Sequence, residues 1–258
     1  MTPVALNKGI RSILTVTLLA SLSACSIHVD FENTASSARN QNECVVLVHG
    51  LWRSGFAMNN IANYLERKGY QTVSIDYPST DLPIPELAET YLSTGIQQCE
   101  TTGAEITHLV SHSMGGVLIR QYLQDHTLPD QSKVVMLSPP NQGSQLSETF
   151  GDSWWYKWFV GPAGSSLTKN SNGIINQLKA VDAEVGVIAA QRNWSFWPES
   201  WLPSPNDGTI SVENMKLPEM KDFILVNSGH SMMRYNAEIQ DQIQFFLSKG
   251  VFNHSSSL

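Results

Sequence analysis

The sequence predicts an α/β fold with a mostly parallel sheet flanked by helices. Short runs rich in valine, isoleucine and leucine alternate along the chain with segments whose apolar residues recur at helical spacing. The strand-like runs are apolar at almost every position, which indicates strands covered on both faces. Alternating units of this kind are typical of a parallel sheet with crossover helices.

Six segments are expected to form the strands and four to form the covering helices. In chain order, the expected strands are Cys44–Val48, Thr72–Asp76, Ile106–Val110, Val134–Leu137, Val185–Ala189 and Phe223–Val226. The expected helices are Gly55–Lys68, Ile84–Gln98, Gly116–Gln124 and Ala237–Lys249. We find no internal repeat and no run of charge, so one domain over residues 43–258 accounts for these elements.

The first residues have the pattern of a secretory signal. Two basic residues precede an apolar run from Ile13 to Leu22, which is shorter than the ~20 apolar residues of a membrane-spanning helix. Residues 22–25 resemble a bacterial lipobox, the site at which a signal peptidase cuts before a cysteine. This resemblance implies that residues 1–24 are removed and that Cys25 carries acyl chains.

Residues 25–42 are mostly small and polar, so we expect a tether between the lipid and the domain. Several acyl chains on one terminus would anchor the protein stably to a membrane. The lipobox resemblance implies a Gram-negative cell envelope, and Ser26 after the cysteine favours the outer membrane, with the domain facing the periplasm. An ordinary secreted protein with a chance cysteine at this position is the alternative.

The cysteines divide between lipid attachment and pairing. With Cys25 assigned to the lipid, Cys44 and Cys99 are the only pair left for an oxidising compartment. Cys44 would begin the first strand, and Cys99 would end the helix that leads to the strand beside it. We therefore expect a disulfide between them.

Charge and motif content exclude several classes of function. Without residues 1–24 the chain has 14 basic and 23 acidic residues, a net charge of minus nine that opposes binding to nucleic acid. No spacing resembles a metal site, a phosphate-binding loop or a dinucleotide fingerprint. We expect no metal and no cofactor.

The strongest chemical signal surrounds Ser113. An apolar run leads up to this serine, and a helical pattern begins directly after it. A sharp strand-to-helix turn of this kind, the nucleophile elbow, holds its serine in a strained backbone that only small neighbours tolerate. Gly115 meets that need, and Ser111 stands where the usual pattern has glycine. The pattern predicts Ser113 as a nucleophile, with a helix N-cap as the alternative role.

A nucleophilic serine needs a base and an acid that orients it, in the chain order serine, acid, histidine. Asp207 lies in a turn rich in proline and glycine, and His230 directly follows the last expected strand. These two residues are therefore predicted to complete a catalytic triad. The other acids considered are Asp182, Asp152 and Glu199, and the other histidines are His108, His112 and His126.

Backbone amides that stabilise an oxyanion are expected at two turns. Met114 follows the nucleophile, and Gly50 allows a tight turn after the first strand that would aim the Leu51 amide at the site. Trp52 or Arg53 would instead line an acyl pocket. We interpret His49 and His112 as structural hydrogen-bonding residues and Asp76 as part of a strand-end turn.

Two segments, Trp154–Phe159 and Trp194–Trp201, interrupt the alternation and hold six of the seven tryptophans. Long insertions in such folds serve as lids or binding loops, so we expect lid-like insertions. Packing of the two segments on each other as a small separate core is the other interpretation. The side chains expected to bind substrate are Trp52, Trp155, Trp158 and Trp197.

Together these motifs resemble the bacterial lipase/esterase-like branch of the α/β-hydrolase superfamily, over nearly all of the chain after residue 42. The motifs that carry the resemblance are residues 43–51, 76–80, 112–116, 139–143, 206–208 and 230–234. The resemblance implies the α/β-hydrolase fold and a serine hydrolase that cleaves carboxylic esters, with an ester or lipid as substrate, through an acyl-enzyme on Ser113. An acyltransferase with the same triad and a non-catalytic envelope lipoprotein are the alternatives, and the sequence leaves acyl length and oligomeric state open.

Overall fold

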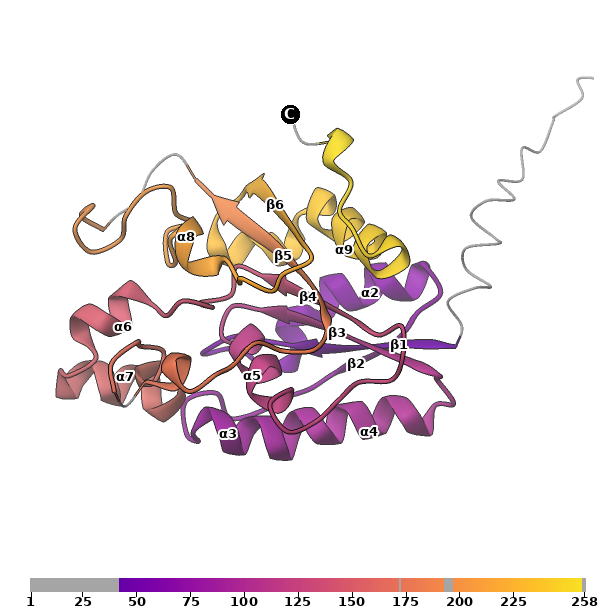
Figure 1. Ribbon diagram of the computed structural model, residues 1–258, viewed down its shortest axis with the longest axis horizontal. Helices are drawn as coiled ribbons and strands as arrows, with labels where there is room; N and C mark the ends of the chain where they lie inside the picture. The colour runs from indigo at the N-terminus through magenta and orange to yellow at the C-terminus, as the bar shows by residue number, and fades with distance from the viewer. Residues whose placement is uncertain (1–41, 172, 193–196, 257–258) are drawn as a thin grey trace, which may run out of the picture. The chain divides into compact units, whose positions relative to one another are not determined.

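A computed structural model describes residues 42–171, 173–192 and 197–256. The expected signal peptide, the lipidated Cys25 and the tether up to residue 41 lie outside these residues, as does Trp194. The described chain contains a six-stranded sheet in the order β2-β1-β3-β4-β5-β6, and every neighbouring pair is parallel. The predicted fold class is confirmed (Figure 1).

All six expected strands are present, with ends that shift by a few residues. They are β1 Glu43–Val48, β2 Gln71–Ser74, β3 Ile106–His112, β4 Lys133–Leu137, β5 Glu184–Gln191 and β6 Asp222–Asn227. The second strand ends at Ser74, earlier than expected. Asp76 there accepts a hydrogen bond from the Gly55 amide at 3.2 Å, so the chain leaves the sheet to pack against the turn after β1.

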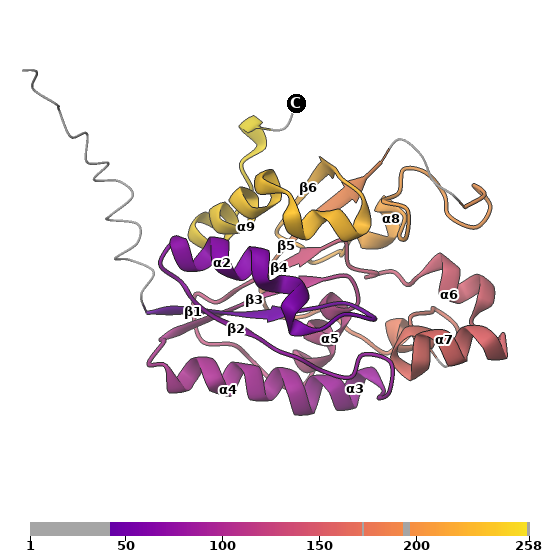
Figure 2. The ribbon, with the colours of Figure 1, turned by 180° about the vertical axis from the view of Figure 1, so that it is seen from behind.

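Helices cover both faces of the sheet, as Figures 1 and 2 show. On one face lie α2 (Asn59–Arg67) and α9 (Ala237–Lys249). On the other lie α3 (Ile84–Leu87), α4 (Ser93–Thr101) and α5 (Gly115–Tyr122), with the short α8 (Val212–Met215) beside β5. A 3₁₀ turn over residues 55–58 precedes α2, and a π turn over residues 88–92 joins α3 to α4.

Strand β1 shows why its sequence is apolar at successive positions. Successive side chains of a strand point to opposite faces. Val46 and Val48 therefore pack with α3, α4 and α5, whereas Val45 and Leu47 pack with α2 and α9. All four side chains are fully buried, so a single polar residue here would place an unpaired group in one of the two cores.

The first aromatic segment forms a helical insertion that the sequence analysis does not assign. After β4 the chain forms α6 (Gln145–Phe150) and α7 (Trp154–Ser165), which lie beyond the carboxyl ends of the strands in Figure 1. Helix α7 is kinked at Gly161, whose φ of 69° is left-handed. A Cβ atom at this position would lie 1.7 Å from the Thr80 carbonyl oxygen, so only glycine permits this contact with the loop after β2.

No helix in the described ranges is both long enough and apolar enough to cross a membrane. A disulfide joins Cys44, in β1, to Cys99, in α4, and both residues are fully buried. It ties β1, the second strand of the sheet, to the helix on one face, across 55 residues of chain.

Reduction of this disulfide is expected to lower the free energy of unfolding by about 2–4 kcal/mol, because the bridge restricts the unfolded chain. Urea unfolding with and without reductant measures the change. Because both cysteines are buried, bridging is checked by alkylation in urea without reductant. Modification of both Cys44 and Cys99 under these conditions would show that no bridge exists.

Candidate active site

Ser113 occupies the turn between β3 and α5 with a φ of 57°, a left-handed conformation that is uncommon for serine. Its amide donates to the Leu137 carbonyl at 2.8 Å, which fixes the turn to β4. A Cβ atom at Gly115 would lie 2.7 Å from the Val48 and His49 carbonyl oxygens. The local sequence therefore supplies the small neighbour that the turn requires.

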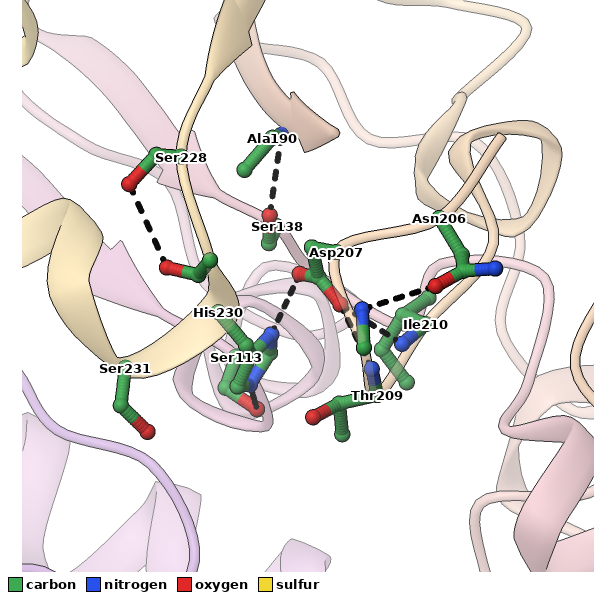
Figure 3. Close-up of polar contacts among 12 residues, drawn as sticks. Ser113, Ser138, Ala190, Asn206, Asp207, Thr209, Ile210, Ser228, His230 and Ser231 are labelled. Carbon is green, nitrogen blue, oxygen red and sulfur yellow. Dashed lines mark hydrogen bonds and ion pairs between the residues drawn. The ribbon is translucent and has the colours of Figure 1, made fainter. Parts of the chain in front are cut away.

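Ser113, His230 and Asp207 form one hydrogen-bonded series, shown in Figure 3. His230 Nε2 lies 2.9 Å from Ser113 Oγ, and His230 Nδ1 lies 2.5 Å from Asp207 Oδ2. Because the carboxylate only accepts, Nδ1 carries the proton and Nε2 can accept one from the serine hydroxyl. The structure brings together the three residues that the sequence analysis selected.

The Asp207 carboxylate is held by its own turn. Its Oδ1 atom accepts hydrogen bonds from the Thr209 and Ile210 amides at 2.9 and 2.8 Å, and the residue is fully buried. Its carbonyl accepts the His230 amide at 3.0 Å, so the two loops are also joined through the backbone. One carboxylate oxygen is therefore fixed by the turn and the other is left to orient the imidazole.

His112 holds the backbone of His230 in place. Its Nε2 atom donates to the His230 carbonyl at 2.9 Å, and burial lowers the pKa of His112 well below its usual value, with further lowering from the nearby His230 and Arg234. His112 therefore stays neutral and acts as a structural donor. His49 is similar: its ring stacks on Tyr77 with centroids 3.9 Å apart, and burial lowers its pKa.

The other acids and histidines considered from the sequence have different surroundings. Asp182, Asp152 and Glu199 are exposed. His108 binds the Glu43 carboxylate at 2.9 Å, at the end of the sheet where β1 begins, and His126 binds Glu89 at 2.9 Å. None of these residues takes part in the series that reaches Ser113.

The Leu51 and Met114 amides have the surroundings expected of oxyanion donors. Within the described residues, neither amide donates a hydrogen bond to a protein acceptor. The next amide along the chain, that of Trp52, donates a hydrogen bond to Ser79 Oγ at 3.0 Å. A Cβ atom at Gly50 would lie 2.9 Å from Ser113 Cβ, so glycine allows the turn after β1 to approach the nucleophile closely.

A pocket of about 640 Å³ opens beside Ser113 and is walled mainly by apolar side chains. Leu51 and Trp52, from the turn after β1, line one part of it. Most of its aromatic side chains come from α6, α7 and the segment after residue 196. The Trp52 indole also donates to the Phe159 carbonyl at 2.8 Å, which attaches α7 to the turn after β1. The aromatic residues of the wall are Trp52, Phe150, Trp155, Tyr156, Phe159, Trp197 and Trp201.

The expectation for Trp158 is corrected by this arrangement. Trp155 and Phe159, four residues apart on α7, line the pocket, whereas Trp158 does not and is 83% exposed. Spacing alone does not separate Trp158 from Trp155, because residues three apart also lie near one face of a helix, so the placement of α7 against the pocket decides which tryptophan lines it. Phe150, Tyr156, Phe159 and Trp201 are wall residues that the sequence analysis did not select, although most lie within or beside its aromatic segments.

The described residues contain no group of three or more histidine, cysteine or acidic side chains placed to hold a metal ion.

Comparison with known proteins defines the class. The model of the alpha/beta hydrolase family matches residues 45–239, which is most of the chain, so this protein belongs to that family. No curated protein matches the chain by sequence. Solved structures with the same fold share little sequence identity with it.

Three of these structures illustrate the likeness. The mature lipase BlEst2 of Bacillus licheniformis is 21% identical with a TM-score of 0.63, over 80% of this chain and 91% of that one. A monoacylglycerol lipase of Paleococcus ferrophilus is 16% identical with a TM-score of 0.55, over 81% and 95% of the two chains. The phospholipase PlaB of Legionella pneumophila is 14% identical with a TM-score of 0.56, over 81% of this chain and 57% of that one.

Stability is expected to fall as the pH drops below about 6.5. Burial lowers the pKa of His49, His108 and His112 in the folded protein, so below 6.5 the unfolded chain binds protons that the folded chain does not. Each histidine contributes up to ~1.4 kcal/mol per pH unit. Urea unfolding between pH 5 and 7.5 measures how the free energy of unfolding changes with pH. His112→Gln should reduce this slope by up to ~1.4 kcal/mol per pH unit, the contribution of one proton. An unchanged slope would show that the His112 pKa is not lowered in the folded protein.

Proposed function

We propose that this protein is a serine hydrolase that cleaves carboxylic esters through an acyl-enzyme on Ser113. The observation that carries the proposal is the hydrogen-bonded series from Asp207 through His230 to Ser113, set at an apolar pocket. Membership of the alpha/beta hydrolase family supports a hydrolytic reaction. The similar lipases and the phospholipase, which share only the fold, are consistent with an ester as substrate.

In the first half of the reaction, Ser113 Oγ attacks the ester carbonyl carbon while its proton passes to His230 Nε2. The Leu51 and Met114 amides donate hydrogen bonds to the carbonyl oxygen as it becomes negatively charged. When the carbon–oxygen bond to the alcohol breaks, His230 gives its proton to the departing oxygen. Asp207 stabilises the imidazolium throughout and stays ionised.

In the second half, water takes the place of the alcohol. His230 removes a proton from the water as its oxygen attacks the acyl carbon, and the proton then returns to Ser113 Oγ as the carboxylic acid leaves. Transfer of the acyl group to another alcohol would use the same residues and would require that water be excluded. We favour hydrolysis and keep acyl transfer as the alternative.

The pocket wall favours the acyl chain as its occupant. Phe150, Trp155 and Phe159 offer apolar surface next to Ser113, and burial of an acyl chain against them gains roughly 25 cal/mol per Å². A volume of about 640 Å³ exceeds what a short acyl group fills. We therefore propose a preference for medium or long acyl chains.

The lipid anchor on Cys25 and the outer-membrane location are also proposals, supported by the lipobox pattern of residues 22–25. Glu43 begins β1 at the amino end of the sheet, whereas Ser113 lies at the carboxyl end of β3. A tether over residues 25–42 would thus join the domain at the end away from the pocket. At ~3.3–3.6 Å per residue it would reach at most about 65 Å.

Replacing Asp207 with asparagine is expected to lower kcat for p-nitrophenyl butyrate by about 10³- to 10⁴-fold, because the imidazole loses the partner that orients it. Ser113→Ala should abolish labelling by a fluorophosphonate. Asp182→Asn, which makes the same change at an exposed position, serves as the control and should retain activity. Labelling of the Ser113→Ala variant, or full activity of Asp207→Asn, would contradict the mechanism.

Chain-length preference tests the acyl pocket. Trp155→Ala removes apolar wall, so the ratio of kcat/KM for p-nitrophenyl dodecanoate to that for the butyrate should fall about tenfold. Trp154→Ala is the matched control, because Trp154 is its neighbour on α7 but is 79% exposed and does not line the pocket. Equal effects of the two substitutions would show that the acyl chain lies elsewhere.

A further inference from the structure

The pocket is mainly apolar, and Arg53 contributes a permanent charge to its lining. Arg53 lies two residues after Leu51, on the turn that supplies an oxyanion donor. One of its guanidinium nitrogens lies 3.4 Å from Ser231 Oγ, and Ser231 directly follows His230. The Arg53 guanidinium therefore spans the space between the oxyanion turn and the loop that carries the base.

A second arginine, Arg234, contacts the same residue, Ser231. Arg234 is 3% exposed and donates to the Ala57 and Ser231 carbonyl oxygens at 2.9 and 3.2 Å, while its Nε atom has no hydrogen-bond partner. The positive charge of Arg53 is close enough to lower the pKa of Arg234, although burial is the larger cause of that lowering. Two guanidinium groups thus approach one another at Ser231.

No ion pair neutralises either arginine within the described residues. Asp76, which follows β2, accepts a hydrogen bond from the Gly55 amide at 3.2 Å and lies 3.6 Å from His49 Nε2. A chain with a formal net charge of −7 therefore keeps a local concentration of positive charge at the side of its pocket. Such a site attracts an anion.

The position of the charge relative to the reacting atoms indicates which part of a substrate meets it. In Figure 3, Ser231 lies on one side of Ser113 and His230, and Thr209 and Ile210 lie on the other. The aromatic wall of α6 and α7 supplies the surface for an acyl chain. Since His230 protonates the leaving alcohol, groups beside His230 and away from that wall face the alcohol portion.

We infer that Arg53 forms a subsite for a phosphate carried by the alcohol portion of the ester, so that the substrates are acyl esters of a phosphorylated alcohol. This inference rests on the proposed function and narrows its substrate class. The planar guanidinium can donate two parallel hydrogen bonds to phosphate oxygens. Arg234, fixed by carbonyl oxygens, strengthens the local field and holds the Ser231 loop in place.

A pair of soluble esters that differ only in the phosphate tests the subsite. Steady-state kcat/KM is measured for 1-hexanoylglycerol 3-phosphate and for 1-hexanoylglycerol, and their ratio is the readout. The wild type should favour the phosphate by at least tenfold at low ionic strength, with a decline as salt screens the charge. Arg53→Gln should lower the ratio about tenfold or more, and Arg53→Lys should lower it less.

Arg67→Gln is the matched control, because it removes one charge from an exposed position on α2 that does not line the pocket. It should change the ratio by less than twofold. A wild-type preference for the neutral ester, an unchanged ratio in Arg53→Gln, or an equal loss in Arg67→Gln would overturn the subsite while leaving ester hydrolysis intact.

Failure of the proposed function itself would look different, since neither ester would be hydrolysed. Binding of glycerol 3-phosphate to the Ser113→Ala variant, measured by calorimetry, then decides. Binding that is lost in the Ser113→Ala, Arg53→Gln double variant would support the anion subsite without the chemistry. No binding by Ser113→Ala would overturn the subsite as well.

Discussion

The left-handed turn at Ser113 is the constraint on which the site depends. A parallel sheet brings the carboxyl ends of all its strands to one edge, and the turn lifts the serine hydroxyl at that edge. Gly50 and Gly115 leave the space that the turn occupies, because a side chain at either position would collide with its neighbours. The strain is held by the sheet and by the bond from the Ser113 amide to β4.

Two kinds of surface surround this turn, one apolar and one positively charged. The insertion of α6 and α7 supplies an apolar wall, and Trp52 attaches it to the oxyanion turn through the Phe159 carbonyl. At the charged surface, Arg53 and Arg234 meet at Ser231 without a carboxylate partner in the described ranges. An ester with an apolar acyl chain and an anionic alcohol matches both surfaces, which is why we connect the pocket to one class of substrate.

The strands, and the three residues that the structure brings together at Ser113, are predictable from the sequence because their signals are local. Apolar runs mark buried strands, and Ser113, Asp207 and His230 each sit in a turn whose neighbouring residues identify it. Helix α7 could not be assigned in this way, because five of its first six residues are aromatic and its direction is set by contacts with Trp52 and Thr80, which are distant in the chain. For the same reason the sequence does not distinguish Trp155 from Trp158.

The central claim is that a carbonyl oxygen bound at Ser113 is received by the Leu51 and Met114 amides. A crystal structure of the protein inhibited by a fluorophosphonate with an alkyl chain tests it directly. We predict a bond from phosphorus to Ser113 Oγ, a phosphoryl oxygen about 2.7–3.1 Å from both amide nitrogens, and the alkyl chain against Trp155 and Phe159. A phosphoryl oxygen directed away from both amides, or an adduct on another residue, would contradict the account.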